Sequence, residues 1–206
     1  MLTVEIDGND GTGKTYLINK LRDYLFINFN YDWKLNRDIV FEDRGVLSVA
    51  TLSEEWNKET PDITRTCKLS TENTIYILID DTPVSCQKRI KERGDSIEEE
   101  YHTLDDLIKY RERFNKLRET FFTEIIYVSK NGEDFTDADI HTLALAIITK
   151  HNLMLRNELI KTKSELKVYK DQYGDIDFEK YIRVTKTNLQ VTLIKITDII
   201  KNFNIK

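Results

Sequence analysis

The chain has 206 residues and a net charge of −5, with 40% apolar and 33% charged residues. This length suits one α/β core with an appendage, and the composition excludes both a disordered chain and a membrane protein. The longest strictly apolar run, Leu143–Ile148, is far shorter than the ~20 residues that a bilayer span needs. Cys67 and Cys86 are the only cysteines, which excludes a disulfide framework and a cysteine-based zinc site. The start of the chain lacks the pattern of a secretory signal, so we expect a reducing, cytoplasmic setting.

The charge is unevenly distributed along the chain. Residues 1–150 carry a net charge of −9 and residues 151–206 a net charge of +4. An acidic body repels the phosphate backbone of nucleic acids, and the weak positive charge of the tail is typical of a solvated helix face. We therefore expect neither a nucleic acid nor a membrane as a partner.

Short apolar runs alternate with longer segments of helical periodicity. Runs rich in β-branched residues predict strands at Leu2–Ile6, Asp38–Glu42, Thr74–Ile79 and Glu124–Ser129, with Trp33–Leu35 as a fifth candidate. Apolar residues at helical spacing predict helices at Thr15–Phe29, Val46–Asn57, Pro83–Arg93, Glu99–Phe122 and Asp137–Lys150. Strands that alternate with helices indicate βαβ units, so we expect a doubly wound parallel sheet covered by helices.

The loop after the first strand carries the clearest motif. Its sequence is Gly8-Asn9-Asp10-Gly11-Thr12-Gly13-Lys14-Thr15, which matches G-x-x-x-x-G-K-[ST] between a predicted strand and a predicted helix. Glycines allow backbone N–H groups to surround a phosphate, and the helix N-terminus adds its positive dipole end. Lys14 can then bridge the β- and γ-phosphates while the Thr15 hydroxyl binds Mg²⁺. The motif predicts a P-loop NTPase fold that binds ATP with Mg²⁺.

Two blocks give the chain a resemblance to a known family. The segment Ile6–Thr15 resembles the phosphate loop of thymidylate kinases and related nucleotide kinases, and Asp43-Arg44, followed by Ser48, is similar to their strand-end Asp-Arg motif. The resemblance implies that Asp10 faces the acceptor sugar. It also implies that Asp43 works with Mg²⁺ and the attacking oxygen while Arg44 grips phosphate. A carboxylate at the carboxyl end of a parallel strand lies where ligands bind in such sheets.

A third block resembles the lid of these kinases. Arg89 and Arg93 lie at the end of a predicted helix that follows a strand, and Leu107–Phe114 resembles the helix after the lid. No cation occupies the variable positions of the phosphate loop, so the lid arginines are the nearest candidates to contact the γ-phosphate. Arginines on an exposed helix face are also common without any such role.

The resemblance implies ATP-dependent phosphoryl transfer to a deoxynucleoside monophosphate. Between the first helix and Asp43, however, only Asn28–Arg37 remains, without the arginine motif that binds the acceptor in thymidylate kinases or their thymine-reading pair. Two alternatives therefore stay open. One is a deoxynucleoside kinase, and the other is a nucleotide-binding regulatory or assembly protein without turnover.

Histidines and aromatic residues add little to this prediction. The histidines, which show no ligand spacing, are interpreted as surface or helix residues: His102, His141 and His151. Three aromatic residues could stack on a nucleobase but at helical spacing are as typical of a core: Tyr101, Tyr110 and Phe114.

Residues 151–206 exceed what a kinase core needs, so we expect a core at 1–150 and an extension beyond it. Leu155 and Leu159 begin one apolar stripe, and Leu189 and Leu193 belong to another. Gly174 separates the two stripes and suits the end of a helix. The pattern predicts a C-terminal helical hairpin, which can pack on its own sheet, form a homodimer or hold another protein. Its surplus apolar residues favour a homodimer through 151–206.

Overall fold

A computed structural model of the chain describes residues 1–32, 37–94 and 102–173. The chain forms two compact units, 1–155 and 156–206. Within the described ranges, no helix contains a stretch long and apolar enough to cross a bilayer.

Four parallel strands form the sheet of the first unit. They are β1 (Leu2–Gly8), β2 (Ile39–Asp43), β3 (Thr74–Asp80) and β4 (Ile125–Ser129), in the order β2-β1-β3-β4. All three pairings are parallel, with Val4 opposite both Phe41 and Ile75. The four predicted strands are thereby confirmed, and the fifth candidate at 33–35 lies outside the described residues.

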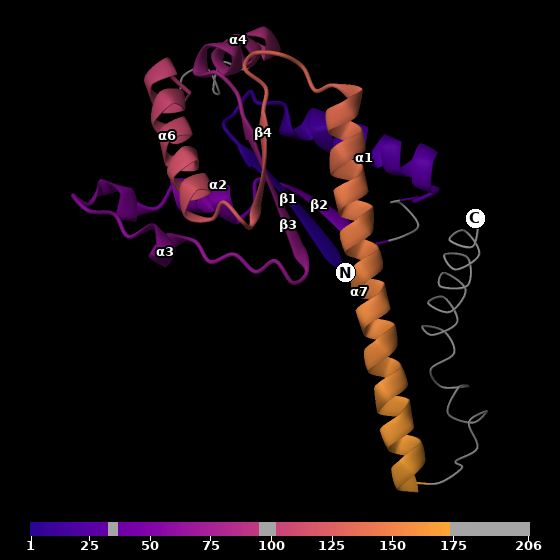
Figure 1. The fold of residues 1–206 in the computed structure, drawn as a ribbon. Coiled ribbons are helices and arrows are strands. Elements are labelled where there is room, and N and C mark those ends of the chain that lie inside the picture. Colours follow the sequence, from indigo (N-terminus) through magenta and orange to yellow (C-terminus); the bar gives the residue numbers. More distant parts are fainter. Residues whose placement is uncertain (33–36, 95–101, 174–206) are drawn as a thin grey trace. The chain divides into compact units, whose positions relative to one another are not determined.

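Helices cover both faces of this sheet, as Figure 1 shows. One apolar cluster joins β1, β2 and β3 to α1 (Lys14–Phe29) and to the first turns of α7 (Asp137–Tyr173). The opposite cluster joins β3 and β4 to α2 (Val46–Thr51) and α6 (Leu104–Thr120). The doubly wound α/β arrangement that the alternation of strands and helices predicted is therefore confirmed.

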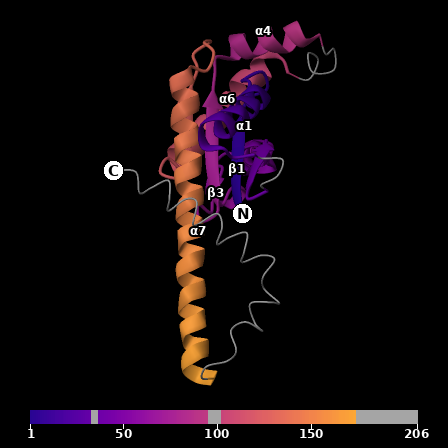
Figure 2. The same ribbon diagram turned by 90° about the vertical axis from the view of Figure 1, so that its right-hand side faces the viewer.

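Helix α4 (Pro83–Arg93) begins where the sequence predicts. Pro83 occupies its first turn, and the Thr82 hydroxyl accepts a hydrogen bond from the backbone N–H of Ser85 at 3.2 Å. The helix lies at the carboxyl end of the strands (Figures 1 and 2), where it packs on α6 through Cys86, Ile90 and Leu107.

Other helix boundaries differ from the prediction. The helix expected over Val46–Asn57 ends at Thr51, because the Ser53 side chain caps a separate 3₁₀ turn, η1 (Glu54–Asn57). Of the helix expected over Glu99–Phe122, residues 99–101 lie outside the described residues. The remainder begins at Leu104, since Thr103 is the N-cap of α6, and it ends at Thr120. One additional turn, α3 (Ile63–Thr66), was not predicted; Asp62 caps it.

The helix expected over Asp137–Lys150 continues to Tyr173. Neither glycine nor proline occurs between Asp137 and Tyr173, so the sequence offers no stop before Gly174. The first arm of the expected hairpin is therefore part of α7. Its second arm lies in 174–206, outside the described residues.

Candidate functional site

The phosphate loop connects β1 to α1 at the carboxyl edge of the sheet. Gly11 has a φ of +80°, and a Cβ at this position would collide with the backbone carbonyl of Cys86 in α4. Only glycine therefore allows the loop to turn this tightly against α4. The loop is also tied to α6, because the Asn9 side-chain amide donates to the carbonyl of Leu107 at 2.8 Å.

The N-terminus of α1 is open to an anion. Its N-cap is Gly13, with a φ of +91° and no side-chain cap, and the first turn contains no acidic residue. The first backbone N–H groups of a helix have no partner within the helix and lie at its positive end. This combination favours a phosphate group at the loop.

Lys14 is buried within the loop. Its ammonium group donates to the carbonyls of Gly8 and Asn9 at 3.0 Å each, and Asp10 lies 3.8 Å away. Burial lowers the pKa of Lys14, and the nearby carboxylates of Asp10 and Asp43 oppose that shift. The Lys14 amine is thus held within the loop by two carbonyl oxygens.

The two predicted Mg²⁺ ligands lie in contact. The Thr15 hydroxyl, in the first turn of α1, donates to Asp43 Oδ2, at the end of β2, at 2.6 Å. In the part of the chain that the structure describes, His, Cys, Asp and Glu side chains form no cluster of three suited to a metal. A Mg²⁺ ion here would therefore take its remaining ligands from phosphate oxygens and water, which is its usual preference.

Arg44 adopts a left-handed backbone conformation, with a φ of +71°. Its N–H donates to the carbonyl of Ile6 at 3.1 Å, and the next N–H, of Gly45, donates to the Asp7 carboxylate at 2.8 Å. The conformation is costly for a residue other than glycine, and here both bonds to β1 maintain it. As a result the Arg44 guanidinium reaches back over the loop and pairs with Asp10 at 2.5 Å.

Asp7 anchors the segment after β2 from within the core. The carboxylate is fully buried, and its Oδ1 accepts from the N–H groups of Gly45 and Ser48 and from the Ser48 hydroxyl. Among the described residues its Oδ2 has no hydrogen-bond partner. Burial raises the pKa of Asp7, although its hydrogen bonds and the charge of Lys14 act in the opposite direction.

His102 lies at the site, contrary to its interpretation as a surface or helix residue. It precedes α6, and its Nε2 lies 2.9 Å from Asp10 Oδ2 with 21% of the side chain exposed. Asp10 is thus held between Arg44 on one oxygen and His102 on the other. No motif identifies His102, because only the fold brings the start of α6 to the loop. His141 and His151 lie in α7, as interpreted.

The two predicted lid arginines occupy different places. Arg89 Nη1 donates to the carbonyl of Gly11 at 3.1 Å and to Asp81 at 2.5 Å, so it grips the loop from the α4 side. Arg93 lies in the exposed last turn of α4. Lys130, which was not predicted, donates to the carbonyl of Thr12 at 3.3 Å. Asp81 and Lys130 each directly follow a strand, a position that could have identified them.

The aromatic residues divide between core and surface. Phe114 is buried in the cluster between α2, α6 and the sheet, so it belongs to the core. The ring of Tyr110 lies 5.8 Å from the guanidinium of Arg113, which also lies 5.5 Å from Trp56. Tyr101 lies outside the described residues.

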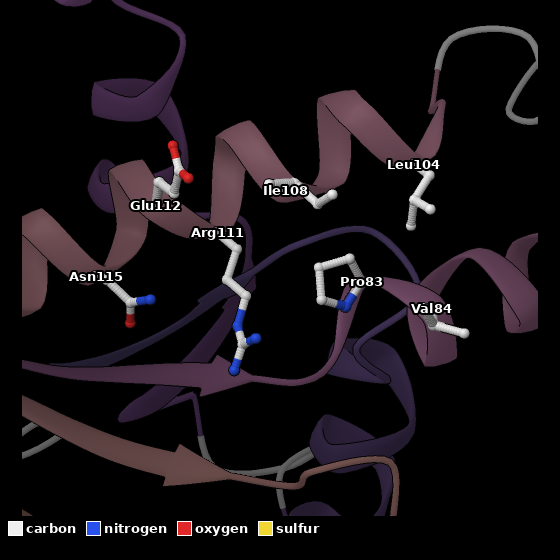
Figure 3. Close-up of a pocket in the computed structure, with 7 residues that line it drawn as sticks. All are labelled: Pro83, Val84, Leu104, Ile108, Arg111, Glu112 and Asn115. Carbon is white, nitrogen blue, oxygen red and sulfur yellow. The ribbon is translucent and has the colours of Figure 1, made fainter.

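A separate hollow of about 360 Å³ lies between the start of α4 and one face of α6 (Figure 3). Its lining contains none of the phosphate-loop residues and consists of Pro83, Val84, Leu104, Ile108, Arg111, Glu112 and Asn115. Arg111 extends from α6 to the end of β3, where it binds both oxygens of Asp80 at 2.7 Å. The hollow is thus distinct from the predicted nucleotide site.

Comparison with known proteins finds likenesses among solved structures alone. No protein-family model and no curated protein matches the chain. Among solved structures, a deoxyadenosine kinase from M. mycoides with bound dCTP aligns with 72% of this chain and 100% of its own, at 12% identity and a TM-score of 0.46. With so distant a likeness, the functional assignment rests on the geometry of the loop itself.

Proposed function

We propose that this chain transfers the γ-phosphoryl group of ATP, with Mg²⁺, to a nucleoside monophosphate or a nucleoside. The observation that carries the proposal is the convergence of an uncapped helix N-terminus, a buried lysine and the Thr15–Asp43 pair at one edge of the sheet. Phosphoryl transfer requires mainly positioning and neutralisation of charge, which such groups provide.

Each group of the donor side has a role in this proposal. The loop amides and Lys14 would hold the β- and γ-phosphates, and Thr15 with Asp43 would hold a Mg²⁺ ion that neutralises charge on the transferring group. Asp43 is also suited to accept the proton of the attacking hydroxyl, because it lies at the strand end beside the loop. Arg93, at the end of α4, is a candidate contact of the γ-phosphate.

Asp10 and Arg44 face the acceptor in this proposal. A carboxylate held by two partners has one defined orientation, which suits it to bind a sugar hydroxyl. The Arg44 side chain is 55% exposed, so its planar guanidinium can contact a phosphate group. The first candidate acceptor is accordingly a deoxynucleoside monophosphate, as the sequence resemblance implies.

A nucleoside is the second candidate acceptor. It is favoured because three arginines near the site already have partners within the protein. Arg44 is paired with Asp10, Arg111 binds Asp80, and Arg113 donates to the carbonyl of Thr51. An unphosphorylated acceptor needs fewer cations than a monophosphate.

A panel of nucleosides and nucleoside monophosphates, incubated with ATP and Mg²⁺, tests the proposal. Phosphorylated product from monophosphates alone would establish the first candidate, and product from nucleosides alone the second. ATP binding without transfer to any acceptor would contradict the proposal and would favour a nucleotide-binding regulatory or assembly protein.

A further inference from the structure

Two adjacent carbonyl groups of the phosphate loop are held from outside by cations. Arg89 in α4 donates to the carbonyl of Gly11 at 3.1 Å, and Lys130 after β4 donates to the carbonyl of Thr12 at 3.3 Å. The Lys130 side chain is only 4% exposed, and its ammonium group also lies 4.6 Å from the ring centroid of Phe135. The Arg89 side chain is partly buried, with 24% exposed, so neither cation is a fully solvated surface charge.

Both cations converge on one buried carboxylate, that of Asp81. This residue is 1% exposed; its Oδ2 accepts from Arg89 at 2.5 Å and lies 3.7 Å from Lys130. Its Oδ1 accepts from the N–H groups of Thr82 at 2.8 Å and Gly132 at 2.6 Å. A buried carboxylate with this many donors is fixed in position, and so are the cations that it holds.

The direction of these carbonyls determines the direction of the loop amides. In a planar trans peptide the C=O and the following N–H point in opposite directions. A cation on the carbonyl of Gly11 therefore turns the N–H of Thr12 toward the interior of the loop, where it donates to the carbonyl of Asn9 at 3.3 Å. By the same geometry, Lys130 on the carbonyl of Thr12 directs the N–H of Gly13 away from itself.

We infer that Asp81 is a positioning residue for the phosphate loop, acting through Arg89 and Lys130. The three side chains hold the peptide groups of residues 11–13 with their N–H groups directed inward before a nucleotide binds. This inference rests on the proposed nucleotide-binding function of the loop. Donors that are oriented in advance need little reorganisation when the phosphate arrives, which strengthens binding. The N–H of Thr12 has only to exchange its 3.3 Å bond to the Asn9 carbonyl for one to a phosphate oxygen.

Asp80 supplies a matched control one residue away. Its carboxylate is also buried and also binds an arginine, since Arg111 contacts both oxygens at 2.7 Å and the Tyr127 hydroxyl donates at 2.7 Å. These partners lie on α6 and β4. Asp80→Asn thus removes a comparable buried ion pair that does not contact the loop. Its effect on exchange and on MgATP binding measures what the loss of any such pair does.

The test combines amide hydrogen exchange with nucleotide titration on the full chain. Exchange of the amides of residues 11–14 is measured without nucleotide, and the Kd for MgATP is measured by calorimetry. We expect Asp81→Asn and Lys130→Met to speed exchange in the loop and to weaken MgATP binding by about 10–100-fold, as loss of supporting groups does at metal sites. Asp80→Asn should leave both quantities near wild type, and Lys130→Arg should restore most of the loss.

The inference would be overturned by one result. In that result, amide exchange in the loop and the Kd for MgATP change no more in Asp81→Asn and Lys130→Met than they do in Asp80→Asn. If Asp81→Asn does not fold, the comparison of Lys130→Met with Lys130→Arg decides, because both retain the stem that packs near Phe135. A wild-type protein that binds no nucleotide would refute the proposed function. The exchange comparison in nucleotide-free protein would still decide the role of Asp81.

Discussion

The two sides of the candidate site are built differently. On the donor side, the charged groups around the phosphate loop are buried, with Asp7 and Asp81 at most 1% exposed and Lys14 at 6%. On the acceptor side, Arg44 is exposed, and the chain continues through the short elements α2, η1 and α3. Buried charges need fixed partners, whereas exposed groups on short elements can adapt.

This difference indicates that the donor side of the site is the more rigid of the two. A triphosphate presents the same charged oxygens whatever base it carries, so a fixed loop suits it. The acceptor differs among kinases in base, sugar and phosphate, and short helices with solvent-facing side chains tolerate such variation. We therefore expect substitutions on the donor side to have the larger effects.

The largest effect is expected from Lys14→Met, which removes the ammonium group and keeps most of the side-chain volume. Loss of one preorganised charge-stabilising group typically lowers kcat by about 10²–10³. Steady-state kinetics with ATP and Mg²⁺ measure it, and circular dichroism verifies the fold. Lys20→Met, an exposed lysine on the same helix, serves as the control. Near-wild-type turnover of Lys14→Met would refute the proposed donor site.

At the exposed end of β2, where the two sides meet, Asp43→Asn should lower turnover about tenfold or more, because the amide keeps the shape but loses the charge proposed to bind Mg²⁺. The Mg²⁺ concentration for half-maximal activity should rise in the same variant. The control is Asp38→Asn. Asp38 lies just before the first residue of β2, at the opposite end of the strand from Asp43, so this variant should leave the Mg²⁺ dependence unchanged. An unaltered Mg²⁺ response in Asp43→Asn would place the metal elsewhere.

His102→Ala sharpens the comparison, because His102 lies just before the N-cap of α6 and contacts Asp10, the loop carboxylate that we propose faces the acceptor. Loss of a hydrogen bond to a charged group costs about 1.5–3 kcal/mol, and we expect a roughly tenfold or larger fall in kcat/KM for the acceptor. The KM for ATP should change little. His141→Gln, which alters a contact with Tyr24, is the control. Equal losses for ATP and acceptor would instead indicate a general role in folding.

A smaller effect concerns the pH dependence of stability. The folded-state pKa of Asp7 is raised above 3.8, chiefly by burial, so the folded chain binds its proton more tightly than the unfolded chain does. The contribution of this group to stability therefore falls as pH rises from about 4 to the folded pKa, with a slope that approaches about 1.4 kcal/mol per pH unit. Denaturant unfolding of wild type and Asp7→Asn between pH 4 and 8 should show a difference that changes with pH, because only the wild type loses stability in this way. A difference independent of pH would contradict the raised pKa.

The smallest effect on activity is expected from removal of the C-terminal extension, which lies outside the sheet. We propose that residues 151–206 form a homodimer contact, supported by the exposed apolar side chains of Leu153 and Ile160 on α7. Sedimentation of the full chain should give a dimer, and a chain ending at Lys150 should give a monomer with similar turnover. A full chain that sediments as a monomer at every concentration would refute this contact.

The sequence by itself predicted the strands, the phosphate loop and the side chains that we propose bind phosphate and Mg²⁺ there. Strands rich in β-branched residues, such as Thr74–Asp80, and the run Gly8–Thr15 are local signals, because each depends on neighbours in the chain. The Thr82–Pro83 start of α4 is local in the same sense, and the structure places it where the prediction did. Boundaries were less well predicted where side-chain caps decide them, as at Ser53 and Thr103.

Only the tertiary structure decided which distant side chains share the loop. His102 and Asp10 are far apart in the sequence, as are Lys130 and Thr12, and no periodicity links the members of either pair. They meet because parallel strands bring their carboxyl ends, and the segments that follow them, to one edge of the sheet. The physical reason is that a buried charge takes its partner from whichever element packs against it, and that packing is a property of the whole fold.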